Sequence, residues 1–93
     1  MKEPLEQTVV RRVIGNILAV GTVRFSKHAL DEMSKDGMTT PDVLNVLRSG
    51  VVEVPELQTG TWRYRIRTRE AYVVIAFRSE LSLVIVTAWR LER

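Results

Sequence analysis

The stretch TWRYRIRT, residues 61–68, decides the fold, because it alternates strictly between large apolar side chains and arginines. A period of two is typical of a β-strand whose two faces meet different surroundings. One face would carry the apolar members, which are Trp62, Tyr64 and Ile66. The other would carry the basic members, which are Arg63, Arg65 and Arg67. We call the sheet surface on this second side the arginine face.

The next apolar stretch, residues 71–78, fits as the second arm of a hairpin. With a two-residue loop between the arms, apolar residues face one another: Ile66 opposite Val73, Tyr64 opposite Ile75 and Trp62 opposite Phe77. On the arginine face the same register sets Tyr72 opposite Arg67 and brings in no carboxylate. A shift by one residue would destroy this separation, so the pattern itself predicts the register.

Two further runs favour strands, residues 51–57 and 82–89, and short connections favour antiparallel neighbours. Pro55 marks the first run as an edge strand. The orientation of the last run depends on the turn before it. A connection of two or four residues turns Leu83, Ile85, Thr87 and Trp89 toward the arginine face, where Thr87 can lie beside Tyr72. A connection of three residues turns Val84, Val86 and Ala88 toward it instead.

Three helices are expected ahead of the strands. Apolar pairs at helical spacing over residues 5–20 predict the first. Ser26 is the predicted N-cap of the second helix, which ends at Asp36-Gly37, and Thr40 is the predicted N-cap of the third, which ends at Gly50. This order predicts an α+β fold, with three N-terminal helices packed on one face of a four-stranded, mainly antiparallel sheet.

The composition predicts a single domain over residues 1–93, with 45% apolar residues and no cysteine for disulfides or thiolate metal sites. No apolar run approaches the roughly 18 residues of a membrane span, and polar residues interrupt the N-terminal one. We therefore expect a cytoplasmic protein that does not bind membranes. The charge is uneven: the balance is −1 over residues 1–60 and +4 over residues 61–93, where every basic residue is arginine.

The arginine face suits a polyanion, since a guanidinium group binds phosphate or carboxylate in a bidentate fashion. One histidine and no cysteine suit a zinc site poorly, and glycine-rich phosphate loops and the G-x-S-x-G motif are absent. We expect no cofactor and no metal. Of the reactions that such a surface could support, RNA cleavage without a metal requires the fewest additional groups. It requires groups that transfer protons and cations beside the phosphate. The plainer interpretation is a solvated sheet face that uses arginine.

Two further residues each allow two interpretations. His28 is the one histidine, and histidine titrates near neutrality. It can serve as a proton acceptor if the start of its helix reaches round an edge of the sheet. Otherwise it is an exposed residue without a role, since the apolar stripe of that helix lies on the other side. Trp89 can stack on a base or pack within the fold.

Several short motifs resemble those of a known family. The segment FSKHAL, residues 25–30, is followed by Met33, by GMT at residues 37–39 and by Asp42-Val43, and later by WRYR at 62–65 and VIVT at 84–87. In this order they resemble a small toxin-like domain, the domain of unknown function 4258 type, within the RelE/MqsR/BrnT-like mRNA interferase superfamily. The similarity covers residues 23–90, so residues 1–21 would be an extra N-terminal helix and residues 22–93 a RelE-like core.

The resemblance implies a RelE-like fold and a metal-independent endoribonuclease, the toxin of a toxin–antitoxin system, which acts on RNA and is bound by a cognate antitoxin protein. By position, the catalytic residues it implies are His28, Arg63, Arg65, Tyr72 and Thr87. The arginines expected to bind RNA beside them are Arg67, Arg78 and Arg90. The chain departs from the family pattern at Glu32 and Asp36, where many members carry arginine, and this weakens RNA binding on that side.

An alternative from a different class is a non-catalytic binding or regulatory module of the same fold. In this hypothesis the arginine face binds an acidic protein segment or nucleic acid without cutting it. The first helix then docks a partner or forms a homodimer, because its apolar stripe would exceed what a small sheet needs.

Overall fold

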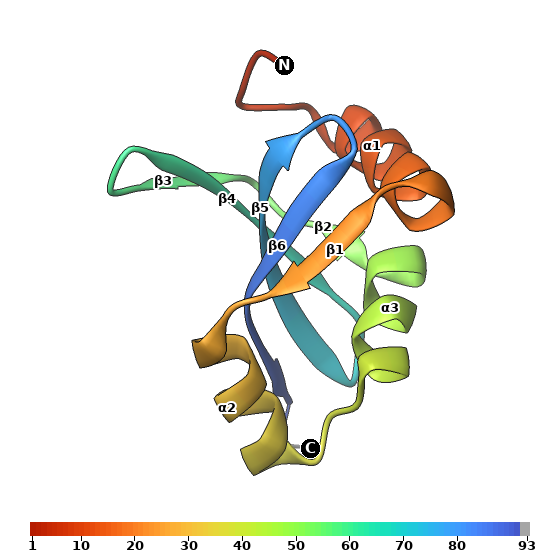
Figure 1. Ribbon diagram of the computed structural model, residues 1–93, viewed down its shortest axis with the longest axis vertical. Helices are drawn as coiled ribbons and strands as arrows, with labels where there is room; N and C mark the ends of the chain where they lie inside the picture. Colours follow the sequence, from red (N-terminus) through yellow and green to blue (C-terminus); the bar gives the residue numbers. More distant parts are fainter. Residues whose placement is uncertain (92–93) are drawn as a thin grey trace.

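Three helices and six strands follow one another along residues 1–91, the part of the chain that the computed structural model describes (Figure 1). In chain order they are α1 (Gln7–Val20), β1 (Thr22–Phe25), α2 (Lys27–Asp36), α3 (Thr40–Ser49), β2 (Val51–Val52), β3 (Glu56–Gln58), β4 (Thr61–Arg67), β5 (Ala71–Ser79) and β6 (Ser82–Arg90). The predicted α+β class and the three helices are confirmed. Residues 92–93 of the predicted domain lie outside the described residues.

The predicted four-stranded, mainly antiparallel sheet is wrong. The sheet is mixed and has six strands, in the order β1-β6-β5-β4-β2, with β3 also paired to β4. One extra strand is β1, which runs parallel to β6 with Phe25 opposite Ile85. The other arises because the run expected over residues 51–57 is split into β2 and β3 around Pro55, which has no N–H for a ladder.

The helix starts follow local capping chemistry. Ser26 caps α2 as predicted, its side chain accepting a hydrogen bond from the Ala29 N–H at 3.0 Å. The N-cap of α3 is Thr39, one residue before the predicted Thr40. Thr39 forms a capping box with Asp42, in which each side chain accepts a hydrogen bond from the other residue's N–H.

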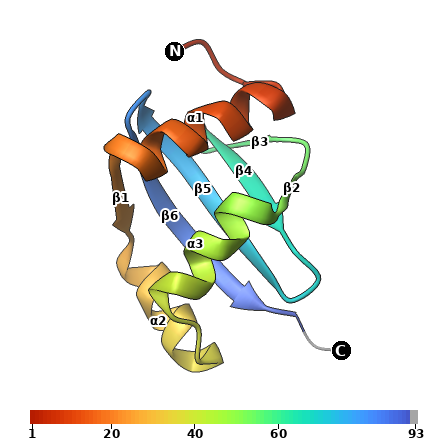
Figure 2. The same cartoon turned by 90° about the vertical axis from the view of Figure 1, so that its right-hand side faces the viewer.

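Figure 2 shows α1 and α3 in front of one face of the sheet, whereas α2 follows β1 at the lower left and packs against β6. The largest fully buried side chains come from both layers: Tyr64, Ile14, Ile17, Ile66, Ile75, Leu83, Ile85, Val10, Val43 and Val73. The apolar stripe of α1 is part of this core, with Val10, Val13, Ile14 and Ile17 all buried. These four side chains therefore pack within the chain itself.

The predicted hairpin register is confirmed over residues 64–67, whereas the predicted pair of Trp62 and Phe77 is not part of this ladder. Tyr64 lies opposite Ile75, Ile66 opposite Val73, and Arg67 opposite Tyr72. Tyr64 is completely buried, and its hydroxyl donates to the Glu3 carboxylate at 2.8 Å. Burial raises the pKa of Tyr64 to about 12.

A β-bulge in β6 decides which of its residues reach the arginine face. Val74 lies opposite Thr87, but Ile75 lies opposite Ile85, so Val86 is an extra residue in the ladder. Leu83, Ile85 and Ala88 are therefore buried in the core, while Thr87 and Trp89 take the other side. Neither predicted orientation of the last strand holds along its whole length, and Trp89, not Thr87, lies opposite Tyr72.

No helix within residues 1–91 has the length and apolar character needed to cross a membrane.

Candidate functional site

Three rows of side chains cross the arginine face. The first runs from Arg67 through Tyr72 to Trp89, and the second from Arg65 through Val74 to Thr87. In the third, Ala76 lies opposite Val84, and Val84 lies opposite Arg24 of β1. Sequence reasoning missed Arg24. Its signal was the alternation of Val23, Arg24 and Phe25, which repeats the pattern of residues 61–68 on a shorter scale.

A hollow of about 210 Å³ opens on the second row, and we call it the first hollow. Its lining residues are Glu56, Gln58, Arg63, Arg65, Val74, Thr87 and Trp89. The fold thus brings together three of the predicted catalytic residues, Arg63, Arg65 and Thr87, from two strands that are not neighbours. Thr87 reaches this hollow because of the bulge beside it.

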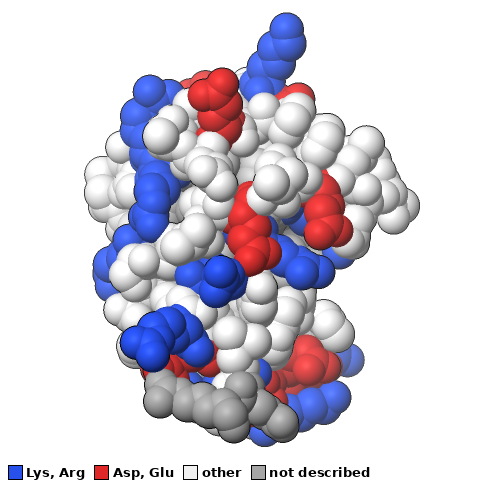
Figure 3. All heavy atoms as spheres, turned by 180° about the vertical axis from the view of Figure 1, so that it is seen from behind, with Lys and Arg blue, Asp and Glu red and all other residues white. Residues whose placement is uncertain are grey.

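The prediction that no carboxylate shares this face is wrong. Glu53 and Glu56 come from the edge segment around Pro55, which runs alongside β4. Glu53 Oε2 lies 2.8 Å from Arg67 Nε and accepts a hydrogen bond from the Tyr72 hydroxyl at 3.1 Å. Glu56 Oε1 lies 3.9 Å from Arg65 Nε. Figure 3 shows acidic groups among basic ones on the side that it presents.

These ion pairs are too exposed to hold the arginines firmly. The side chains of Arg65 and Glu56 have relative exposures of 43% and 53%. Pairs of this kind contribute about 0–1 kcal/mol, because water screens them and two long side chains must be ordered. An incoming phosphate can therefore replace the glutamate at Arg65 at little cost to the fold.

Arg63 is held differently. Its Nη1 donates to the Gln58 Oε1 at 2.9 Å, while its Nε is buried and has no hydrogen-bond partner among the described residues. Buried donors are nearly always paired, because an unpaired one loses its hydration without compensation. Arg63 therefore carries an unsatisfied donor in the wall of the first hollow.

Tyr72 and Trp89 form an aromatic pair at the end of the face nearest Arg67. Their ring centroids are 5.0 Å apart with 23° between the planes, which is a stacked geometry. The Arg65 guanidinium carbon lies 5.8 Å from the centre of the Tyr72 ring, within cation–π range. Trp89 packs on Tyr72 and also lines the first hollow.

Five predicted site residues do not line the first hollow, namely His28, Arg67, Tyr72, Arg78 and Arg90. His28 is exposed at the second position of α2 and does not line that hollow. Arg90 is bound to the turn between α2 and α3. Its guanidinium donates to the carbonyl groups of Asp36 and Gly37 and to the Asp42 carboxylate. A cation beside the last carbonyls of α2 stabilises that helix end.

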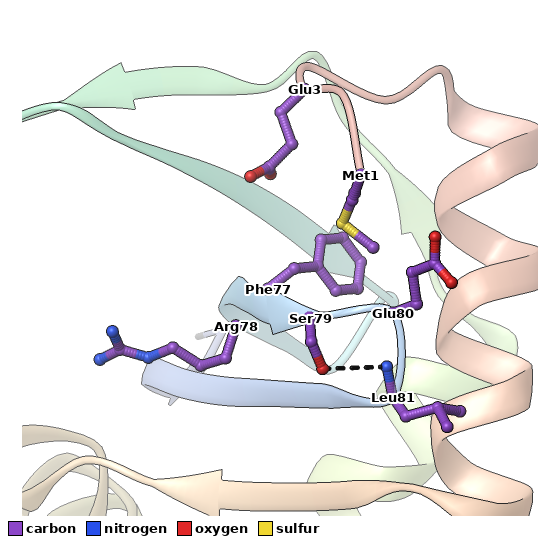
Figure 4. Close-up of a pocket in the computed structure, with 7 residues that line it drawn as sticks. All are labelled: Met1, Glu3, Phe77, Arg78, Ser79, Glu80 and Leu81. Carbon is purple, nitrogen blue, oxygen red and sulfur yellow. Dashed lines mark hydrogen bonds between the residues drawn. The ribbon is translucent and has the colours of Figure 1, made fainter.

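Arg78, the remaining predicted arginine, is exposed near the end of β5 and lines two other hollows. The larger has about 510 Å³ and lies against the β5–β6 turn, where Figure 4 shows Met1 over the Phe77 ring and the Ser79 hydroxyl accepting a hydrogen bond from the Leu81 N–H. In that view the Arg78 side chain points away from Phe77 and Leu81. The smaller, of about 250 Å³, is the second hollow of the arginine face.

Within residues 1–91, no three His, Cys, Asp or Glu side chains are grouped so that they could hold a metal ion.

Comparison with known proteins matches residues 25–90 to one family model, which is described as a domain of unknown function, DUF4258. No curated protein and no solved structure matches the chain. The matched region starts at the last residue of β1, so it includes the first hollow but excludes α1 and Arg24.

Proposed function

We propose that this chain, which belongs to the DUF4258 family, is a metal-independent endoribonuclease with a RelE-like fold that acts as the toxin of a toxin–antitoxin system. The observation that supports this most is the first hollow, where two guanidinium groups and a hydroxyl meet over the apolar side chain of Val74. Such a lining suits a phosphodiester whose charge grows as it reacts.

Arg63 and Arg65 would hold the scissile phosphate in this proposal. Arg63 lines the hollow and would donate to a phosphate oxygen that enters it, and Arg65 would exchange its long contact with Glu56 for that phosphate. Thr87, across β5 from Arg65, would orient the phosphate or the ribose through its hydroxyl. Two cations beside the phosphate would stabilise the negative charge that develops in the transition state.

The cleavage step needs a proton acceptor for the ribose 2′-hydroxyl. The 2′-oxygen forms a bond to phosphorus, the bond from phosphorus to the 5′-oxygen breaks, and the products are a 2′,3′-cyclic phosphate and a 5′-hydroxyl. Glu56 lines the hollow and can take the first proton. Tyr72, held by Glu53, does not line the hollow but stacks on Trp89, which does. The leaving oxygen takes its proton from water, and the resulting hydroxide recovers the proton from Glu56.

The test is induced expression in bacteria, with purified protein incubated with RNA in the presence and absence of ribosomes. The wild type should arrest growth and leave cyclic phosphate ends, and Arg65→Ala should relieve both effects. Arg48→Ala is the matched control, since Arg48 is an exposed arginine on α3, on the helix-covered side. A wild type that is harmless and leaves RNA intact under both conditions would refute the enzyme hypothesis.

A second candidate is a binding module without catalysis. It is favoured by the position of His28 outside the first hollow and by the two glutamates beside Arg65 and Arg67. In this case the arginine face would bind RNA or an acidic protein segment, such as that of an antitoxin, and return it unchanged. Retention of intact RNA by the purified protein, lost in Arg65→Ala but kept in Arg48→Ala, would select this candidate.

A further inference from the structure

The second hollow lies beside the first, and Arg63 lines both of them. Its lining residues are Ser26, Thr61, Arg63, Ala76, Phe77, Arg78, Val84 and Val86. The bulge in β6 links the two spaces, because the extra residue Val86 lines the second hollow and the next residue, Thr87, lines the first. The arginine face thus carries two adjoining hollows of similar size, about 210 and 250 Å³.

The two hollows differ in charge. Glu56 lines the first, whereas no Asp or Glu is among the described residues that line the second. Arg63 and Arg78 line the second, and Arg24 stands on the same face, directly opposite Val84 of its wall. The cation-rich surface without carboxylates that the sequence suggested around Arg67 is therefore found toward β1 instead.

The size of the hollows favours part of a polymer as their ligand. Sites that enclose a free small molecule usually measure about 300–1,000 Å³, and each of these spaces is smaller and open. Arg63 and Arg65 are two residues apart on β4, which is about 7 Å along a strand. This step is of the same order as the separation of neighbouring phosphates in an extended single strand of RNA.

We propose that the second hollow binds the nucleotide next to the one held in the first hollow, so that one RNA strand crosses the arginine face from Arg65 past Arg63 to Arg78. This inference rests on the proposed function for the identity of the polymer. Arg78 and Arg24 would bind the flanking phosphate, and Arg63, which lines both hollows, would donate to an oxygen between the two units. The apolar wall, formed by Ala76, Val84 and Val86, would contact the sugar or the base.

The test measures binding of an eight-nucleotide oligouridylate whose 2′-oxygens are methylated, so that binding is read without cleavage. Arg78→Ala and Arg24→Ala should each weaken binding at low salt and flatten the slope of log K against log salt by about 0.7 per lost phosphate contact. Ala76→Leu should fill the second hollow and weaken binding without changing the charge. Arg48→Ala is the control, and circular dichroism checks that every variant is folded.

The outcomes separate the two proposals. If the wild type binds the oligonucleotide and Arg65→Ala weakens it, but Arg78→Ala, Arg24→Ala and Ala76→Leu all behave like Arg48→Ala, the second hollow is not a nucleotide site and the proposed function stands. If the three variants weaken binding but unmodified RNA is never cleaved, the second hollow is supported and the nuclease is refuted. A wild type that does not bind the oligonucleotide overturns the second-hollow proposal, while growth arrest and RNA cleavage decide the proposed function separately.

Discussion

Thr87 lies opposite Val74 across the β5–β6 ladder, on the side of the sheet away from the helices. In a regular strand this position would have put its neighbour Val86 in the core, but the bulge makes Val86 an extra residue and leaves the buried positions to Ile85 and Ala88. One inserted residue thus keeps the core intact and also supplies a hydroxyl to the row that begins at Arg65.

The two faces of β4 should respond oppositely to truncation. Ile66 is completely buried, so Ile66→Ala should lower the free energy of unfolding by roughly 2–5 kcal/mol. Arg65 is partly exposed, and Arg65→Ala should change it by no more than about 0.5 kcal/mol. Urea denaturation of both variants measures this. If Arg65→Ala unfolds the domain while Ile66→Ala is tolerated, the faces are assigned the wrong way round.

Replacing a glycine by alanine should change the stability in opposite directions at two positions, one within α1 and one at its end. A Cβ at Gly15 meets nothing within 4 Å, so Gly15→Ala should stabilise the protein by about 0.5–1 kcal/mol through higher helix propensity. A Cβ at Gly21 would collide with the Leu81 carbonyl oxygen and lie 2.9 Å from the Ile17 Cα, so Gly21→Ala should destabilise it. Melting temperatures compare the pair, and equal shifts would contradict the close approach of α1 to the β5–β6 turn.

Stability should fall in strong alkali because of Tyr64. Its folded pKa of about 12 lies above the ordinary value of 10.0, so the folded state favours the protonated phenol. The stability that the protonated Tyr64 phenol contributes to the folded state is fully present below pH 10 and is lost as the pH rises through about 12. Tyr64→Phe should remove this part of the pH dependence of stability. Chemical denaturation at a series of pH values between about 8 and 12 measures this. Tyr72→Phe, on the arginine face, serves as the comparison and should retain it.

Acid should weaken the start of α3. The hydrogen bond from the Thr39 backbone N–H, with Arg90 nearby, holds the pKa of Asp42 below its usual value of 3.8. A lowered pKa gives stability that is present above the ordinary value and is lost as the pH falls through the folded one. Asp42→Asn should therefore narrow the difference in melting temperature between about pH 7 and pH 3. Asp31→Asn, an exposed position on α2, should leave that difference as in the wild type.

Much of the fold could be predicted from the sequence where the pattern is unambiguous. The strict alternation of residues 61–68 admits one hairpin register, and that register is present. The last strand could not be oriented, because apolar residues fill both parities of residues 83–89 and nothing in them marks a bulge at Val86. The β1 strand was missed because four residues are too few for a clear period.

The candidate site could likewise be predicted only where a local sequence pattern places its residues. Arg63 and Arg65 follow directly from alternation within one strand, whereas Glu53 and Glu56 depend on how the edge segment passes Pro55. Pairing of that segment with β4 brings both carboxylates to the arginines, and no local pattern indicates it. Arg90 is the opposite case. Its place in the arginine-rich last third of the chain suggested RNA binding, but its Nε and Nη2 donate to carbonyl groups at the end of α2.

The burial of α1 has a consequence for how this family is cut into fragments. The sequence shared with the family begins at Phe25, yet the helix before it supplies Val10, Val13, Ile14 and Ile17 to the common core. An expression fragment trimmed to residues 25–90 would keep the first hollow and lose the cover over part of the sheet. We therefore expect a fragment of residues 25–90 to expose core side chains that α1 covers and to be less stable than the chain that includes α1.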